Sequence, residues 1–114
     1  MSFASPIEFY HVVKRAWSAE TVLTPFDPAD PCRNQCAVTA LAVQHHFGGE
    51  IINTKTKNGT HFYNEIAGSY WDLAADQFDE PIPYENNTSS RDEAFDHATP
   101  DQLARLLINI DKLS

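Results

Sequence analysis

Three residues of this sequence have the types and the chain order that catalysis by a thiol requires: Cys36, His61 and Asp72. A cysteine thiolate attacks a carbonyl carbon, an imidazole assists its formation and then protonates the leaving group, and a carboxylate fixes the tautomer and orientation of the imidazole. The same residues also occur as a small buried thiol and as hydrogen-bonded sheet residues with no chemical role. The elements that position the three side chains decide between these interpretations.

Cys36 begins the most apolar stretch of the chain. Every residue from 37 to 43 is apolar except Thr39, which predicts a helix that is buried on nearly all sides. Gly48 and Gly49 predict its end, because glycine readily adopts the left-handed conformation of a helix C-cap. Unpaired N–H groups and the positive end of the dipole at a helix N-terminus favour a thiolate. We therefore expect a central helix that opens with a reactive cysteine.

A β-hairpin is predicted after this helix. Residues 60–66 are rich in aromatic and β-branched side chains, which is typical of a strand. Ala67-Gly68 is a turn signal, and residues 69–73 read as the returning strand.

This hairpin brings His61 and Asp72 to one face of the sheet. A turn at residues 67–68 pairs residue 63 with residue 72, so Asp72 becomes a diagonal neighbour of His61 within reach of its side chain. Asp76 would lie diagonally on the other side of the same position. Either carboxylate is therefore a candidate for the third catalytic residue.

Donors for the oxyanion of a tetrahedral intermediate are expected near Cys36. The backbone N–H of Cys36 is one, and the side-chain amide of Gln35 or Asn34 is the second. Gln77 follows the predicted hairpin, and it either hydrogen-bonds near the site or satisfies the backbone at the end of the strand. The expected substrates are peptides, proteins or small amides.

Amphipathic helices are predicted at both ends of the chain. The first has Ser5 as N-cap and Pro6 at the first helical position, and the last begins with a capping box formed by Thr99 and Gln102. Apolar residues at helical spacing follow both starts, which indicates that each helix contributes to the core.

The remaining segments complete an α+β architecture. Residues 50–55 form a further strand candidate, and the polar residues 81–98 are expected to form a surface loop that a partner could order. We expect a single compact domain over residues 1–114, with the buried helix packed on a small antiparallel sheet and helices flanking it.

Composition excludes several classes of function. The 114 residues carry a formal net charge of −8, which disfavours a nucleic-acid partner. No apolar run approaches the ~20 residues of a membrane span, and the N-terminus lacks the pattern of a signal peptide, so we expect a cytoplasmic protein. No glycine-rich phosphate loop is present, and neither a cofactor nor a metal ion is expected. Cys32 and Cys36 leave a thiol redox pair as an alternative, and the oligomeric state stays open.

Several segments resemble the YunG-like family of small bacterial proteins: residues 17–21, 34–41, 47–50, 61–64 and 71–73. Members of that family more usually have glycine where this chain has Asn34. The order of cysteine on a helix, then histidine and aspartate on paired strands, is also similar to papain-like and transglutaminase-like enzymes. That resemblance implies Cys36 as nucleophile, His61 as acid and base, and Asp72 as the orienting residue.

The sequence thus predicts a small cysteine hydrolase or acyltransferase that acts on an amide, ester or thioester. Peptidase, isopeptidase, deamidase and transglutaminase-type activities are not distinguished. In the papain family a glutamine several residues before the cysteine supplies an oxyanion donor, and Asp30 occupies that position here. The alternative is a non-catalytic binding or accessory protein that keeps a papain-like shell.

Overall fold

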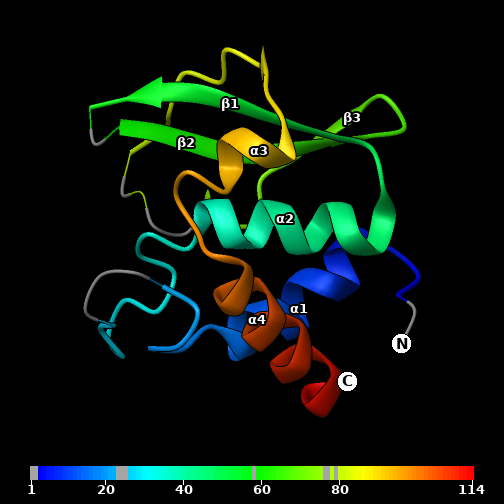
Figure 1. Ribbon diagram of the computed structural model, residues 1–114. Coiled ribbons are helices and arrows are strands. Elements are labelled where there is room, and N and C mark those ends of the chain that lie inside the picture. Colours follow the sequence, from blue (N-terminus) through cyan, green and yellow to red (C-terminus); the bar gives the residue numbers. More distant parts are fainter. Residues whose placement is uncertain (1–2, 23–25, 58, 76–77, 79) are drawn as a thin grey trace.

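A computed structural model describes residues 3–22, 26–57, 59–75, 78 and 80–114 (Figure 1). It is an α+β structure with a four-stranded antiparallel sheet in the order β3-β2-β1-β4. In chain order the elements are α1 (Pro6–Ala16), α2 (Cys36–Phe47), β1 (Glu50–Thr56), β2 (Gly59–Ile66), β3 (Ser69–Trp71), β4 (Asn87–Thr88), α3 (Arg91–Ala94) and α4 (Pro100–Leu113). Within these described ranges, no helix combines the length and the apolar character that a membrane crossing requires.

The predicted central helix is confirmed as α2. It lies between the sheet on one side and α1 and α4 on the other (Figure 1), and residues 37–43 are all buried. Two polar contacts fix its orientation. Asn64 Nδ2 on β2 donates to the Ala40 carbonyl at 3.0 Å, and Trp17 Nε1 donates to Thr39 Oγ1 at 2.9 Å. These bonds satisfy buried polar groups. Without such partners, the transfer of these groups from water into the protein would cost free energy.

The hairpin register is as predicted. Ile66 pairs with Ser69, and Ala67 and Gly68 between them both have positive φ angles, of 51° and 83°. Positive φ at both central residues matches the right-handed twist of the flanking strands. The strand β3 ends at Trp71 rather than at residue 73, because the Asp72 carboxylate accepts the backbone N–H of a residue two positions later and turns the chain.

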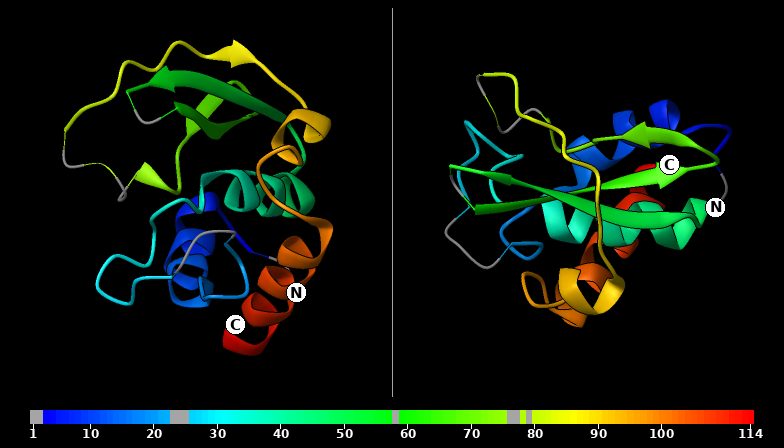
Figure 2. Two further views of the ribbon diagram at one scale, coloured as in Figure 1. Left: turned by 60° about the vertical axis from the view of Figure 1, so that its left-hand side comes forward. Right: turned by 90° about the horizontal axis from the view of Figure 1, so that it is seen from above.

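The expectation of a surface loop at residues 81–98 is wrong for residues 87–88 and 91–94, which lie in regular elements. Residues 87 and 88 form β4 along β1, and the short helix α3 follows with Ser90 as its N-cap. Upstream of β4, the Glu85 carboxylate accepts the backbone N–H of Lys55 at 2.9 Å. Figure 2 shows this segment in yellow as it passes along the sheet to β4. Contacts within the chain therefore hold this segment along the sheet.

Both terminal helices begin as predicted. Ser5 Oγ accepts the backbone N–H of Glu8 at the start of α1. Thr99 and Gln102 form the reciprocal capping box of α4. Asn109 on α4 donates to the Ala16 carbonyl at the end of α1 at 3.0 Å, so the two helices are joined beneath α2.

Candidate active site

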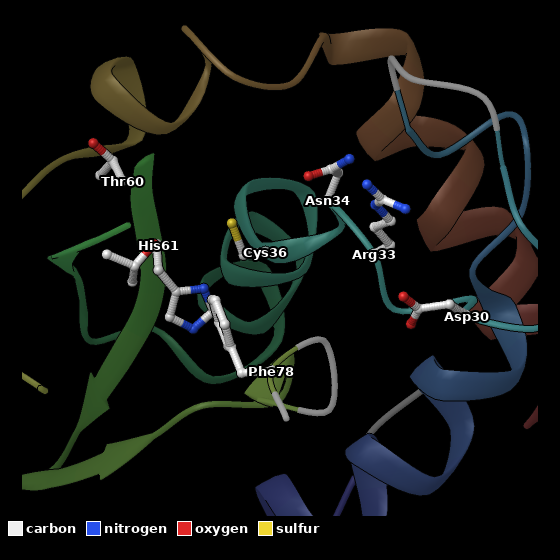
Figure 3. Close-up of a pocket in the computed structure, with 8 residues that line it drawn as sticks. Asp30, Arg33, Asn34, Cys36, Thr60, His61 and Phe78 are labelled. Atoms are coloured by element: carbon white, nitrogen blue, oxygen red, sulfur yellow. The ribbon is translucent and has the colours of Figure 1, made fainter. Parts of the chain in front are cut away.

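The three candidate catalytic side chains lie together. His61 Nε2 is 2.7 Å from Asp72 Oδ2, and the His61 side chain is also hydrogen-bonded to Cys36. Figure 3 shows the imidazole and the thiol facing each other, with Nδ1 as the ring nitrogen toward Cys36. Cys36 is the first residue of α2, His61 lies within β2, and Asp72 directly follows β3. The imidazole therefore bridges the thiol and the carboxylate.

Three donors surround the Asp72 carboxylate. Oδ2 accepts hydrogen bonds from His61 Nε2 and from the Tyr84 hydroxyl, both at 2.7 Å, and Oδ1 accepts the backbone N–H of Ala74 at 3.1 Å. Because a carboxylate accepts hydrogen bonds, these three contacts hold it in one orientation. We therefore assign the proton of neutral His61 to Nε2, which leaves Nδ1 as the acceptor toward Cys36.

The electrostatic surroundings favour the charged form of His61. Burial alone would lower its pKa, but the hydrogen bonds to Asp72 and Cys36 and the charges of these two groups raise the pKa to about 9. The ring is 1% exposed and lies edge-on to Phe78, with 4.8 Å between the ring centroids. Because little water reaches this pair, charges within it interact more strongly than they would at the surface. The site thus stabilises an imidazolium beside the thiol.

A pocket of about 420 Å³ opens in front of the thiol. Cys36 and His61 both line it, and Figure 3 shows the sulfur between the α2 N-terminus and β2. The lining residues are mostly polar: Asp30, Arg33, Asn34, Cys36, Thr56, Thr60, His61 and Phe78. The volume falls in the range of sites for small molecules or for a few residues of a chain.

The two predicted amide donors have different surroundings. Asn34 lines the pocket, in a left-handed conformation with φ of 62° that asparagine tolerates better than most side chains. Gln35 is buried, and its Oε1 accepts from the Thr21 hydroxyl at 2.8 Å. Gln35 therefore points into the protein and not toward an oxyanion. The backbone N–H of Cys36 remains a donor, because the first N–H groups of a helix have no acceptor within it.

The other sequence candidates lie elsewhere. Gln77 and Asp76 fall outside the described residues. Cys32 is buried and donates through Sγ to the Ala74 carbonyl at 3.3 Å, and both Cys32 and Cys36 are free thiols. In the part of the chain that the structure describes, no group of three or more His, Cys, Asp or Glu side chains is arranged to hold a metal ion.

Tyr84 is a site residue that the sequence did not reveal. It contacts Asp72 from across the sheet edge, and the Tyr63 ring lies against it with 5.0 Å between centroids. Burial, followed by its bond to the Asp72 carboxylate, raises the pKa of Tyr84. In the sequence, Tyr84 is one tyrosine within a polar, proline-containing segment. Nothing in that segment indicates that the hydroxyl of Tyr84 bonds to Asp72.

Comparisons with known proteins extend the resemblance over most of the chain. The family model described as "YunG protein" matches residues 5–113. The chain is 38% identical to the uncharacterised protein YunG of Bacillus subtilis (strain 168) over 96 residues, which cover 84% of this chain and 83% of that protein. No solved structure matches this chain. The matched range contains all three candidate catalytic residues.

Proposed function

The chain belongs to the YunG family, and from the arrangement of its polar residues we propose that it is a cysteine-dependent hydrolase or acyltransferase acting on an amide, ester or thioester. One observation carries the proposal: the buried His61 is hydrogen-bonded to Cys36 on one side and, at 2.7 Å, to Asp72 on the other. This is the geometry of a nucleophile, a general acid and base, and an orienting group.

The reaction follows from these positions. The Cys36 thiolate attacks the carbonyl carbon, and the oxygen takes up the negative charge beside the Cys36 N–H and the pocket wall. The carbon–leaving-group bond then breaks while His61 gives its proton to the departing nitrogen, oxygen or sulfur, leaving an acyl thioester on Cys36. His61 next removes a proton from water, or from a second substrate that receives the acyl group. The deprotonated molecule attacks the carbonyl carbon of the thioester. This step releases the acyl product and restores the thiolate and the imidazolium.

The arrangement of the elements also supports a papain-like or transglutaminase-like core. The cysteine opens a buried helix, the histidine lies on an adjacent strand, and the aspartate follows the next strand. The same order of residues carries acyl-transfer chemistry in those enzymes. Under this proposal, water as acceptor gives a hydrolase and an amine gives a transferase.

Alkylation of Cys36 by iodoacetamide tests the proposal directly. We expect the rate to stay high well below the ordinary thiol pKa of about 8.5, because the imidazolium stabilises the thiolate. In H61A the rate should fall at neutral pH and follow an ordinary thiol. H11A is the matched control, since His11 is exposed on α1 and lies outside the pocket lining. Mass spectrometry of the labelled peptide separates Cys36 from Cys32.

A native rate that follows an ordinary thiol pKa, or that is equal in H61A and H11A, would contradict the enzymatic proposal. Because the pocket is present in either case, that result would favour the alternative of a binding or accessory protein. A positive result would justify a screen of amide, ester and thioester substrates with C36A as the inactive reference.

A further inference from the structure

Given the function proposed above, on which this inference rests, we propose that the pocket takes acyl donors that carry a carboxylate close to the reacting carbonyl group. Arg33 binds that carboxylate and is the specificity-determining residue. The inference derives from how the chain presents Arg33 beside Cys36 and from the charges around the pocket.

The segment that leads into α2 is fixed to the protein interior on both sides of Arg33 and Asn34. Cys32 is buried and bonded to a main-chain carbonyl at 3.3 Å. Gln35 is buried and accepts a hydrogen bond from a threonine hydroxyl at 2.8 Å. The two residues between these anchors are exposed, and both line the pocket of Cys36. Because the backbone is held on both sides, the point from which the Arg33 side chain extends is fixed beside the pocket.

Arg33 and Asp30 come from one turn of this segment. The backbone N–H of Arg33 donates to the Asp30 carbonyl at 3.2 Å, and both side chains line the pocket. Figure 3 shows them on one wall with Asn34, opposite the strand that carries Thr60 and His61. A substrate whose carbonyl lies at Cys36 therefore extends along a wall of fixed charges.

The charge of Arg33 is available to a ligand. Within residues 3–22, 26–57, 59–75, 78 and 80–114, the ion pairs join His61 to Asp72 and Arg105 to Glu20, and none includes Arg33. The protein carries a net charge of −8, so its general field repels anions and a local cation is needed to admit one. A guanidinium binds a carboxylate through two parallel hydrogen bonds, which makes it well suited to this group. The Asp30 carboxylate has the opposite effect to Arg33, because it repels an anion in the pocket.

Two alkylating reagents of nearly equal size measure this effect. Iodoacetate carries a carboxylate next to the carbon that Cys36 attacks, and iodoacetamide carries a neutral amide in its place. In both reactions a carbon–sulfur bond forms at Cys36 and iodide leaves. The ratio of the two second-order rate constants at low ionic strength therefore reports how the pocket treats an anion, without any knowledge of the natural substrate.

In R33Q we expect the ratio of iodoacetate to iodoacetamide rates to fall by about threefold or more, as one unit charge at close range predicts. D30N should raise the ratio. R15Q is the matched control, because Arg15 is an exposed residue of α1 outside the pocket and its removal changes the net charge equally. Hydrolysis of mono-4-nitrophenyl succinate against 4-nitrophenyl butyrate extends the comparison to acyl donors, where R33Q should lose the preference for succinate.

An equal ratio in R33Q and R15Q would overturn the assignment of Arg33. So would a native protein that prefers the butyrate ester and keeps this preference in R33Q. The proposed function has a separate readout, because it depends on how H61A changes the iodoacetamide rate alone. A normal H61A effect with an unchanged charge ratio would thus reject the substrate class and leave the enzyme proposal standing.

Discussion

At the scale of single residues, Asp72 is the most heavily bonded group of the site. One of its oxygens is shared between the imidazole of His61 and the hydroxyl of Tyr84, each at 2.7 Å. A hydrogen bond from tyrosine spreads the negative charge of the carboxylate and weakens its hold on the imidazolium. Tyr84 is therefore a positioning residue, which limits how basic His61 becomes.

The Y84F variant tests this role. Removal of the hydroxyl leaves more of the Asp72 charge to act on His61, so we expect the pKa of His61 to rise above its native value of about 9. The imidazole ring protons report this titration by NMR. Y70F is the control, because Tyr70 is 55% exposed on β3. A His61 titration that is the same in Y84F and Y70F would show that the tyrosine acts only through packing.

The His61–Asp72 pair also makes stability depend on pH. The pKa of His61 is raised from 6.5 to about 9, so the folded protein binds this proton more tightly than the unfolded chain does. The stabilisation is complete below pH 6.5 and is lost as the pH rises through 9. We expect urea unfolding to show a decrease on the order of 3 kcal/mol over this interval.

In D72N the amide keeps the size of the side chain but removes the charge that holds the proton on His61. The decrease in unfolding free energy between pH 6.5 and 9 should then be much smaller. If D72N and the native protein lose the same stability over this interval, another group causes the pH dependence.

At the scale of elements, the connection between α2 and β1 passes close to the backbone of β2. Gly48 and Gly49 both have positive φ, of 71° and 77°, but only one of them is close to β2. A Cβ on Gly49 would lie 2.3 Å from the Glu65 carbonyl oxygen, whereas a Cβ on Gly48 would meet nothing within 4 Å. The first contact is with backbone, which cannot move aside as a side chain can.

This difference makes G49A and G48A a matched pair. Both variants strain the backbone, so the extra cost of G49A measures the contact with β2. We expect G49A to lower the free energy of unfolding by about 1–3 kcal/mol more than G48A does. Urea denaturation gives both values. If G49A and G48A lower the free energy of unfolding equally, the β2 backbone shifts to make room for the added methyl group.

The elements that the sequence predicted well are those with a local signal. Ser5, Thr99 and the Ala67-Gly68 turn fix their elements through neighbouring backbone, and the residue pattern is enough to find them. The early end of β3 is also local, since the Asp72 carboxylate accepts the backbone N–H of Ala74, but the strand-like pattern of residues 69–73 concealed it. Gln35 was misread for a different reason. Its amide is held by Thr21, a partner 14 residues away that a local pattern does not reveal.

At the scale of the whole molecule, the site depends on contacts between distant parts of the chain. Tyr84 reaches Asp72 only because residues 84–88 are fastened to the sheet. The Tyr63 hydroxyl donates to Asn86 Oδ1 at 2.6 Å and accepts the Asn86 backbone N–H at 2.7 Å. Contacts of this kind depend on the assembled fold, which is why the sequence predicted Cys36, His61 and Asp72 but missed Tyr84.

The Y63F variant should therefore act on the site from a distance. Loss of the Tyr63 hydroxyl removes both of its hydrogen bonds to Asn86, an exposed residue that water can still reach, so each lost bond costs about 0.5–1.5 kcal/mol at most. We expect faster amide hydrogen exchange in residues 84–88 and a shift of the His61 titration in the same direction as in Y84F. The double variant Y63F/Y84F should shift that titration no further than Y84F alone. Additive shifts would mean that the two tyrosines act independently.

The sheet has one more consequence, which concerns how a protein or peptide could approach it. Its two long inner strands are bordered by outer strands of only three and two residues, β3 and β4. These outer strands pair only with residues 64–66 of β2 and residues 52–53 of β1, so among the described residues the rest of both long strands has no strand on its outer side. An extended peptide can add to an edge of this kind through main-chain hydrogen bonds.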